Sequence, residues 1–202
     1  PVVKTFTWMI PDGNRKRGLR LLRQAATEGY YVQTEAIYYL TQVHYLYEED
    51  YSETLDYVRR LRERHPANPY FHSFEGRVYA RWGRWDRAEE VFATVARRCE
   101  AGEPGYNVHM EELSRYYLGR AHLYDQEYDQ ALTHLERLEH LTDRDIEDPR
   151  YRILGFLYQG MVYDAMGERD QATQLYRRVL DMEDPIGIHD RAERYLQDPY
   201  SG

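Results

Sequence analysis

Arginine and tyrosine are the side chains of this sequence with the greatest capacity for recognition. All but two of its 27 basic residues are arginines, and 21 of its 202 residues are tyrosines. Arg77 and Arg120 each follow a glycine in similar surroundings, and Arg81 lies one helical turn beyond Arg77. The planar donors of a guanidinium suit carboxylates and phosphates better than the point charge of lysine does. This set predicts a site for an anionic group.

Eight histidines and one cysteine could also support chemistry, but their spacing does not favour it. No two histidines lie four residues apart. His44 and His122 occupy places that similar segments give to Tyr79 and Tyr163, which favours a role in the core. Cys99 follows two arginines that could lower its pKa, but no base accompanies it, so we interpret it as a structural cysteine. We expect no metal site and no cofactor.

The remaining charged runs have ordinary explanations. The segment 143–148 begins like a calcium-binding loop, but it lacks the required glycine and the terminal glutamate. The basic runs near Arg60, Arg97 and Arg177 fall late in expected helices, where cations complement the helix dipole. The net charge of −8 argues against non-specific binding to nucleic acid. No nucleophile or phosphate-loop motif is present, so we expect a protein that is not an enzyme.

The sequence gives little information about the cellular compartment of the protein or the organism that encodes it. No apolar run reaches the ~20 residues that a membrane span requires. The chain begins at Pro1 rather than Met, so we expect a piece of a longer protein, and its compartment stays open. We interpret the scarcity of lysine as the mark of a GC-rich, bacterial genome, with adaptation to salt as the alternative.

Internal repeats dominate the pattern along the chain. In the segment 76–95, small residues alternate with bulky ones at the spacing of two packed helices. The small residue Gly76 recurs as Gly119 and Gly160, and Ala88 recurs as Ala131 and Ala172. The position of Phe92 is occupied by Leu135 and Tyr176 in the two later repeats. A less regular repeat, with one extra residue in its turn, covers about 40–66, and a half repeat begins at Gly13.

At these residues the chain resembles the tetratricopeptide repeat family, over about 13–184. The resemblance implies an all-α fold, a right-handed solenoid of antiparallel helix pairs that binds proteins in its concave groove. We expect about four full repeats, a half repeat at the N-terminus and a capping helix at the C-terminus, within a repeat domain at 13–198. Residues 1–12 are expected to form an extended arm over the first helix, or else a cut linker, and Tyr200–Gly202 should fray. The expected helices are Asn14–Thr27, Val32–Tyr47, Ser52–His65, Pro69–Arg81, Asp86–Cys99, Val108–Asp125, Asp129–Leu141, Pro149–Met166, Asp170–Asp181 and Ile188–Gln197.

Members of this family bind through the leading helix of each pair. Projecting that face onto this sequence selects mainly tyrosines and arginines, which are common at binding hot spots. On the fifth repeat the projection gives Leu157, Met161 and Asp164, and on the second it also gives Glu35. The candidate partner-binding residues are Tyr38, Gln42, Tyr70, Arg77, Arg81, Tyr116, Arg120 and Tyr124.

The leading hypothesis is therefore a protein–protein interaction scaffold that binds a peptide of acidic character in its groove. Arg77 and Arg120 should then be neighbours along one wall, and would repel one another unless Glu35, Asp164 or an anion joins them. One alternative is a self-associating module, a homodimer. Another is a docking domain of a larger protein. The tyrosines could also serve as packing alone.

Overall fold

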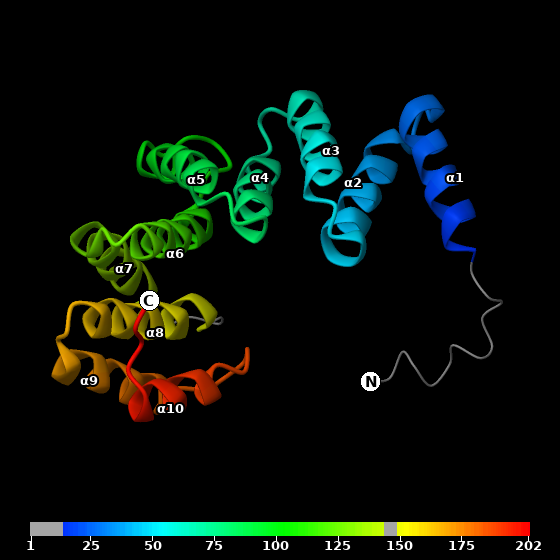
Figure 1. The fold of residues 1–202 in the computed structure, drawn as a ribbon. Helices are drawn as coiled ribbons and strands as arrows, with labels where there is room; N and C mark the ends of the chain where they lie inside the picture. Colours follow the sequence, from blue (N-terminus) through cyan, green and yellow to red (C-terminus); the bar gives the residue numbers. More distant parts are fainter. Residues whose placement is uncertain (1–13, 144–148) are drawn as a thin grey trace. The chain divides into compact units, whose positions relative to one another are not determined.

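The computed structural model describes residues 14–143 and 149–202, and in these ranges it contains helices and no strands (Figure 1). The predicted all-α fold is confirmed. The chain divides into two compact units, the first ending at Pro66 and the second running from Ala67 to Gly202. The expected arm at 1–12 lies outside the described residues. None of the described helices is long and apolar enough to cross a membrane.

Between residues 14 and 66, the first unit consists of three helices and one wide helical turn. Asn14 caps the first helix, because its side chain accepts a hydrogen bond from Arg17 N at 2.9 Å, and the helix ends at Glu28 with Gly29 as its C-cap. The apolar sides of the helices meet in a core of fully buried residues that includes Ile37, Leu40, Val58 and Leu61. The elements are α1 (Arg15–Glu28), α2 (Gln33–Val43), the π-helical turn η3 (His44–Glu48) and α3 (Tyr51–Arg64).

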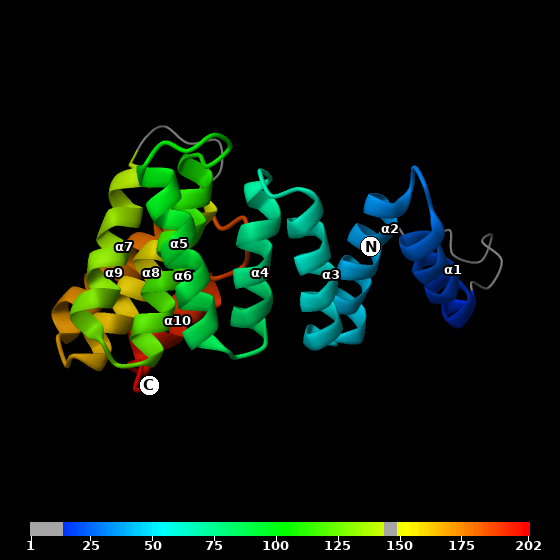
Figure 2. The ribbon, with the colours of Figure 1, turned by 90° about the horizontal axis from the view of Figure 1, so that it is seen from above.

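In its described residues, 67–143 and 149–202, the second unit is a helical solenoid of three helix pairs and a closing helix. Each helix packs against the next in sequence, and α6 also packs against both α4 and α8 (Figure 2). The leading helices α4, α6 and α8 therefore form one layer, as the repeats predict. The elements are α4 (Pro69–Arg81), α5 (Trp85–Glu100), α6 (Val108–Tyr124), α7 (Tyr128–Thr142), α8 (Arg150–Ala165), α9 (Arg169–Leu180) and α10 (His189–Gln197).

Glycines allow the two helices of each pair to approach closely. A Cβ atom added at any of the three repeated glycines would overlap a bulky side chain of the second helix, so only glycine fits there. The predicted pairing of small and large residues is confirmed. The added Cβ would come within 2.8 Å of Phe92 at Gly76, 2.6 Å of Leu135 at Gly119 and 2.5 Å of Tyr176 at Gly160.

The start of the second helix in each pair differs from the prediction. Gly83 adopts a left-handed φ of 77°, but α5 begins at Trp85 and its N-cap is Arg84, which makes no side-chain capping bond. Asp86, the first residue of the expected helix, lies inside the first turn. There its carboxylate still interacts favourably with the positive end of the helix dipole.

The link from α5 to α6 packs onto the repeats through Tyr106. This residue is 6% exposed, and its hydroxyl lies 3.0 Å from His72 Nδ1 and accepts a hydrogen bond from Arg98 at 2.6 Å. Because Tyr106 joins α4 to the end of α5, the extra residues of this link contribute to packing. Most of the corresponding link before α8 lies outside the described residues.

The C-terminus is more ordered than predicted. Tyr200 N donates a hydrogen bond to Asp164 Oδ2 at 3.0 Å, and the Tyr200 ring lies 5.7 Å from the ring of Tyr195. The expectation that Tyr200 frays is therefore wrong. A buried carboxylate gives the chain end a partner that the periodic pattern does not reveal.

Candidate binding site

Three of the predicted site residues come together on α6. Tyr116, Arg120 and Tyr124 follow one another at intervals of four residues, so they lie on one side of the helix. Arg120 donates hydrogen bonds to both hydroxyls, at 3.0 Å to Tyr116 and 3.3 Å to Tyr124. Tyr116 is buried and Tyr124 is exposed, so the guanidinium links the interior of the unit to its surface.

Aromatic rings from three helices surround the Arg120 guanidinium. Cation–π attraction of this kind partly offsets the loss of hydration when a cation is buried. The rings come from α5, α6 and the next leading helix, α8. The distances from Arg120 Cζ to the ring centroids are 4.8 Å for Trp85, 5.2 Å for Tyr116, 5.7 Å for Tyr117, 5.9 Å for Tyr124 and 5.2 Å for Tyr158.

No carboxylate in the described part of the chain pairs with Arg120. Its Nε is buried without a hydrogen-bond acceptor. Burial lowers the pKa of this guanidinium, but Tyr116 and Tyr158 more than compensate and hold its pKa above the usual value. The side chain therefore carries a positive charge that the protein surrounds with dipoles and rings rather than with a counter-ion.

A second guanidinium reaches the same place from α10. Arg191 Cζ lies 5.4 Å from the Tyr158 ring centroid, and its Nη2 lies 3.6 Å from Met161 Sδ. Arg191 is partly buried and likewise pairs with no carboxylate among the described residues. Tyr116, Arg120, Tyr124, Tyr158 and Arg191 are called the inner-face cluster below.

The positive charges of these two arginines change the pKa of the Tyr158 phenol. Burial alone would raise its pKa, but the guanidiniums of Arg120 and Arg191 reverse that effect, and the pKa lies below its usual value of 10.0. Burial raises the pKa of the neighbouring Tyr116 instead. The inner-face cluster therefore favours a negative charge at Tyr158.

Comparison with protein-family models identifies the repeats that carry this cluster. The model described as tetratricopeptide repeat matches residues 113–140 and 155–182. These two stretches of the chain are tetratricopeptide repeats. No curated protein matches the sequence. The two matched tetratricopeptide repeats are the pairs α6–α7 and α8–α9. They supply Arg120 and Tyr158, while Arg191 follows them on the closing helix.

The other predicted site residues are not members of the inner-face cluster. Arg77 on α4 lies over the ring of Phe74, with Cζ 5.3 Å from the centroid, and the Tyr70 ring lies 5.8 Å from that of Phe74. Arg81 is exposed at the end of α4. Tyr38 and Gln42 are partly buried on α2 of the first unit.

Asp164 is not free to neutralise the inner-face arginines. Its side chain is 1% exposed and pairs with Arg169 at 2.9 Å, and it accepts a hydrogen bond from the Tyr176 hydroxyl at 2.8 Å. With its bond from Tyr200 N, Asp164 fastens α9 and the chain end to α8. Glu35, the other acidic candidate, is exposed on α2 in the first unit.

The sequence projection missed Tyr158 and Arg191. It chose Leu157 and Met161 for this repeat, and these are 0% and 2% exposed, so they belong to the core. Tyr158 instead matches the place of Tyr117, one residue further along the helix. Arg191 lies on a helix that the sequence analysis interpreted only as a cap.

Proposed function

We propose that the second unit binds an acidic segment of a partner protein at the inner-face cluster, with carboxylates meeting Arg120 and Arg191. Tetratricopeptide repeats generally mediate protein–protein interactions, and the fold is typically a non-enzymatic scaffold. The observation that carries the proposal is the pair of partly buried guanidiniums beside Tyr158, neither of which has a carboxylate partner in the described residues.

Charge supports an anionic partner. A guanidinium held away from water without a counter-ion lies in a region where an incoming carboxylate interacts more strongly than at an open surface. The Nε of Arg120 is buried without an acceptor, so no hydrogen bond within the described residues offsets its share of the positive charge. The lowered pKa of Tyr158 is a second sign that the same place stabilises a negative charge.

The aromatic surface next to the two guanidiniums favours a peptide, rather than a simple anion, as the ligand. Tyr124 is 41% exposed, and its ring lies 4.8 Å from that of Trp85. Rings of this kind contribute contact area at little entropic cost, and they cluster at binding hot spots. We infer that apolar side chains of the acidic segment pack on Trp85 and Tyr124.

Selection from a library of random peptides tests this function directly. Displayed dodecapeptides are selected on the wild type, and the affinities of the recovered peptides are measured by fluorescence anisotropy. We expect enrichment of Asp and Glu, and binding that weakens as salt rises. Arg191→Gln should weaken binding by about 10- to 100-fold, the usual range for a charged hydrogen bond.

A matched control lies on the same helix. Arg194 is exposed on α10 and packs over Tyr195, outside the inner-face cluster. Arg194→Gln should therefore change affinity by less than about threefold, in keeping with the small contribution of exposed charges. Recovery of basic or neutral peptides, or equal losses in the two variants, would contradict the proposal.

Self-association of the first unit is the second candidate. Of the large hydrophobic side chains exposed in the described residues, most lie between residues 21 and 47, and an apolar group of this size commonly marks a contact surface. Light scattering on the wild type and on Tyr31→Ser with Tyr47→Ser tests it. A dimer lost in the double variant is the expected result, and a wild-type monomer at every concentration excludes it. These side chains are Leu21, Tyr30, Tyr31, Val32, Tyr39, Leu46 and Tyr47.

A further inference from the structure

His44 is a buried histidine whose two ring nitrogens both lack a hydrogen-bond partner. It is 3% exposed in the first unit, as predicted for a core residue, yet neither Nδ1 nor Nε2 has an acceptor or donor. His122, the equivalent residue of a later repeat, differs. Its Nδ1 lies 2.7 Å from Glu127 Oε2. Buried imidazole nitrogens are normally satisfied, so the exception at His44 requires a physical explanation.

The wide turn that follows His44 brings a carboxylate back to it. The chain continues from α2 into the π-helical turn η3, and Glu49 then adopts a left-handed φ of 53°. Asp50 N donates a hydrogen bond to His44 O at 3.2 Å, which closes the turn. This is the repeat whose turn is one residue longer in the sequence. The π-helical turn accommodates that residue, and such turns are frequent at functional sites.

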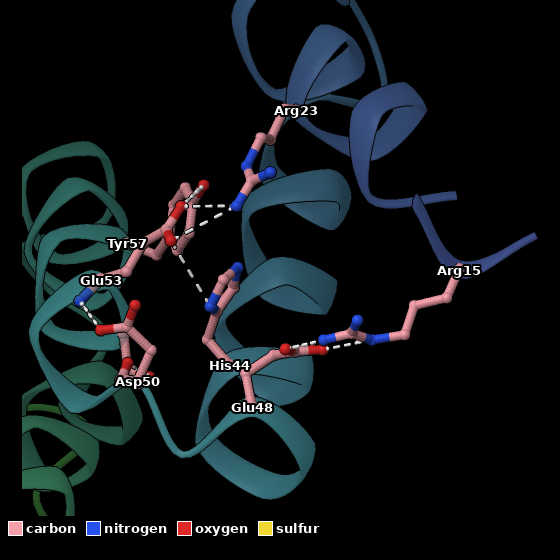
Figure 3. A network of polar contacts seen from close by, with 8 residues as sticks. Arg15, Arg23, His44, Glu48, Asp50, Glu53 and Tyr57 are labelled. Atoms are coloured by element: carbon pink, nitrogen blue, oxygen red, sulfur yellow. Dashed lines mark hydrogen bonds and ion pairs between the residues drawn. The ribbon is translucent and has the colours of Figure 1, made fainter. Parts of the chain in front are cut away.

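A second carboxylate, Glu53, is held in position from the other side. Its Oε1 accepts hydrogen bonds from the Tyr57 hydroxyl at 2.9 Å and from Arg23 at 3.1 Å. Its Oε2 accepts a longer hydrogen bond from Arg23 at 3.3 Å and lies 3.6 Å from His44 Nδ1, too far for a hydrogen bond with the imidazole. Figure 3 shows the His44 ring turned toward Glu53, with Asp50 on the same side.

Asp50 uses only one of its two carboxylate oxygens to cap the helix, so the other can bind a metal ion. Its Oδ1 accepts the capping hydrogen bond from Glu53 N at 3.0 Å, and Oδ2 takes no part in that bond. One ligand atom from each of His44, Asp50 and Glu53 lies within 4.8 Å of the others. Atoms bound to one tetrahedral Zn²⁺ are separated by about 3.3–3.5 Å, given bonds of about 2.0–2.2 Å. Small side-chain rotations would therefore complete such a site.

We propose that His44, Asp50 and Glu53 bind one divalent transition-metal ion of the Zn²⁺ class. One imidazole and two carboxylates suit Zn²⁺, Co²⁺ or Ni²⁺, whereas Mg²⁺ and Ca²⁺ prefer oxygen ligands throughout. The metal takes up an imidazole nitrogen that otherwise lacks a partner. Water completes the coordination, because three protein ligands leave a position open.

The residues around the proposed site suit such an ion, both in their net charge and in the hydrogen bonds that hold its ligands in place. Arg23 neutralises one of the two carboxylates, which leaves one negative charge for the cation. Tyr57 holds Glu53 through Oε1 and Arg23 contacts both carboxylate oxygens, which keeps Oε2 beside His44; outer contacts of this kind orient a metal ligand. A metal here would join the end of α2 to the start of α3, and so stabilise the first unit.

Direct titration of the tag-free full chain with ZnCl₂ tests the proposal. Isothermal calorimetry should show one strong site per chain, and CoCl₂ should give the visible spectrum of a protein-bound cobalt ion, with no heat from MgCl₂. His44→Asn should weaken Zn²⁺ binding at least about tenfold and abolish the cobalt spectrum. His109→Ala is the control for surface histidines, since the His109 side chain is 73% exposed. It should leave the strong site unchanged.

Two further variants keep the test decisive if His44→Asn does not fold. Asp50→Asn retains the helix cap, because asparagine caps as well as aspartate does, and Glu53→Gln retains an oxygen for Tyr57 and Arg23. Both should lose the strong site while keeping the helical spectrum. Zn²⁺ binding that persists in these variants, or that is absent from the wild type at 100-fold molar excess, would overturn the proposal.

Discussion

The guanidinium of Arg120 on α6 lies over the ring of Tyr158 on α8, with 5.2 Å between Cζ and the ring centroid. This contact joins two consecutive tetratricopeptide repeats across the layer of leading helices. Arg191 approaches the same ring from α10 at 5.4 Å. Tyr158 therefore lies between two positive charges, and its ionisation reports on the site that we propose for an acidic partner.

Tyr158 should ionise before Tyr116 and Tyr163. The two guanidiniums lower its pKa below 10.0, whereas burial raises that of Tyr116 and Tyr163. A phenol with a lowered folded pKa adds stability that is complete above the unfolded value and is lost as pH falls through the folded value. Tyrosinate absorbance during alkaline titration should show an early step. Tyr158→Phe should remove that step, and Arg191→Gln should move it to higher pH.

Tyr163→Phe supplies the control for this titration. Tyr163 lies on the same helix, and its pKa is raised, so its replacement should leave the early step in place. An early step of the same size in Tyr158→Phe would show that the arginines do not act on Tyr158.

Gly160→Ala should destabilise the second unit, and Gly155→Ala should not. A Cβ at Gly160 would lie 2.5 Å from Tyr176 Cε1, whereas a Cβ at Gly155 would lie 3.4 Å from Leu138 Cδ2, an ordinary contact. We expect a loss of about 1–3 kcal/mol from overpacking at Gly160. At Gly155 we expect no loss, or a gain of up to about 1 kcal/mol from helix propensity. Urea unfolding of both variants measures the difference, and equal stabilities would contradict the packing described here.

Cys99 should be unreactive in the folded chain. Burial, together with the nearby Glu111, raises the pKa of its thiol from 9.0 to about 11. Since the thiolate is the reactive form, the rate with a chromogenic disulfide reagent at pH 7 should fall roughly 100-fold below that of the unfolded chain. The rate should rise as pH increases toward 11. Native and unfolded rates within threefold of each other would contradict this pKa.

The packing of the repeats could be predicted from the sequence because it depends on local spacing. Gly76 and Phe92 lie sixteen residues apart, a distance that two short helices and a tight turn fix, and the same relation holds at Gly119 and Gly160. The helix starts were less predictable. Asp86 is a good capping residue, yet the left-handed Gly83 sets the turn, and α5 begins one residue before Asp86.

The site residues were only partly predictable because they meet across repeats. Tyr116, Arg120 and Tyr124 share one helix, so their spacing is visible in the sequence. Arg191 lies 71 positions after Arg120, and nothing in the sequence pairs them. The same holds for His44, whose unpartnered nitrogens become apparent only when the turn to Asp50 is seen in three dimensions.

A charge-swap experiment tests the central claim most directly. An acidic peptide selected on the wild type is compared with variants in which each Asp or Glu is replaced by Lys, against wild type and Arg191→Glu. If a peptide carboxylate meets Arg191, one Lys variant should regain affinity with Arg191→Glu, with a coupling free energy of about 1–3 kcal/mol. Arg194→Glu should show no such coupling. Coupling near zero for every peptide position with Arg191→Glu would contradict the proposal that acidic partners dock on the inner-face cluster.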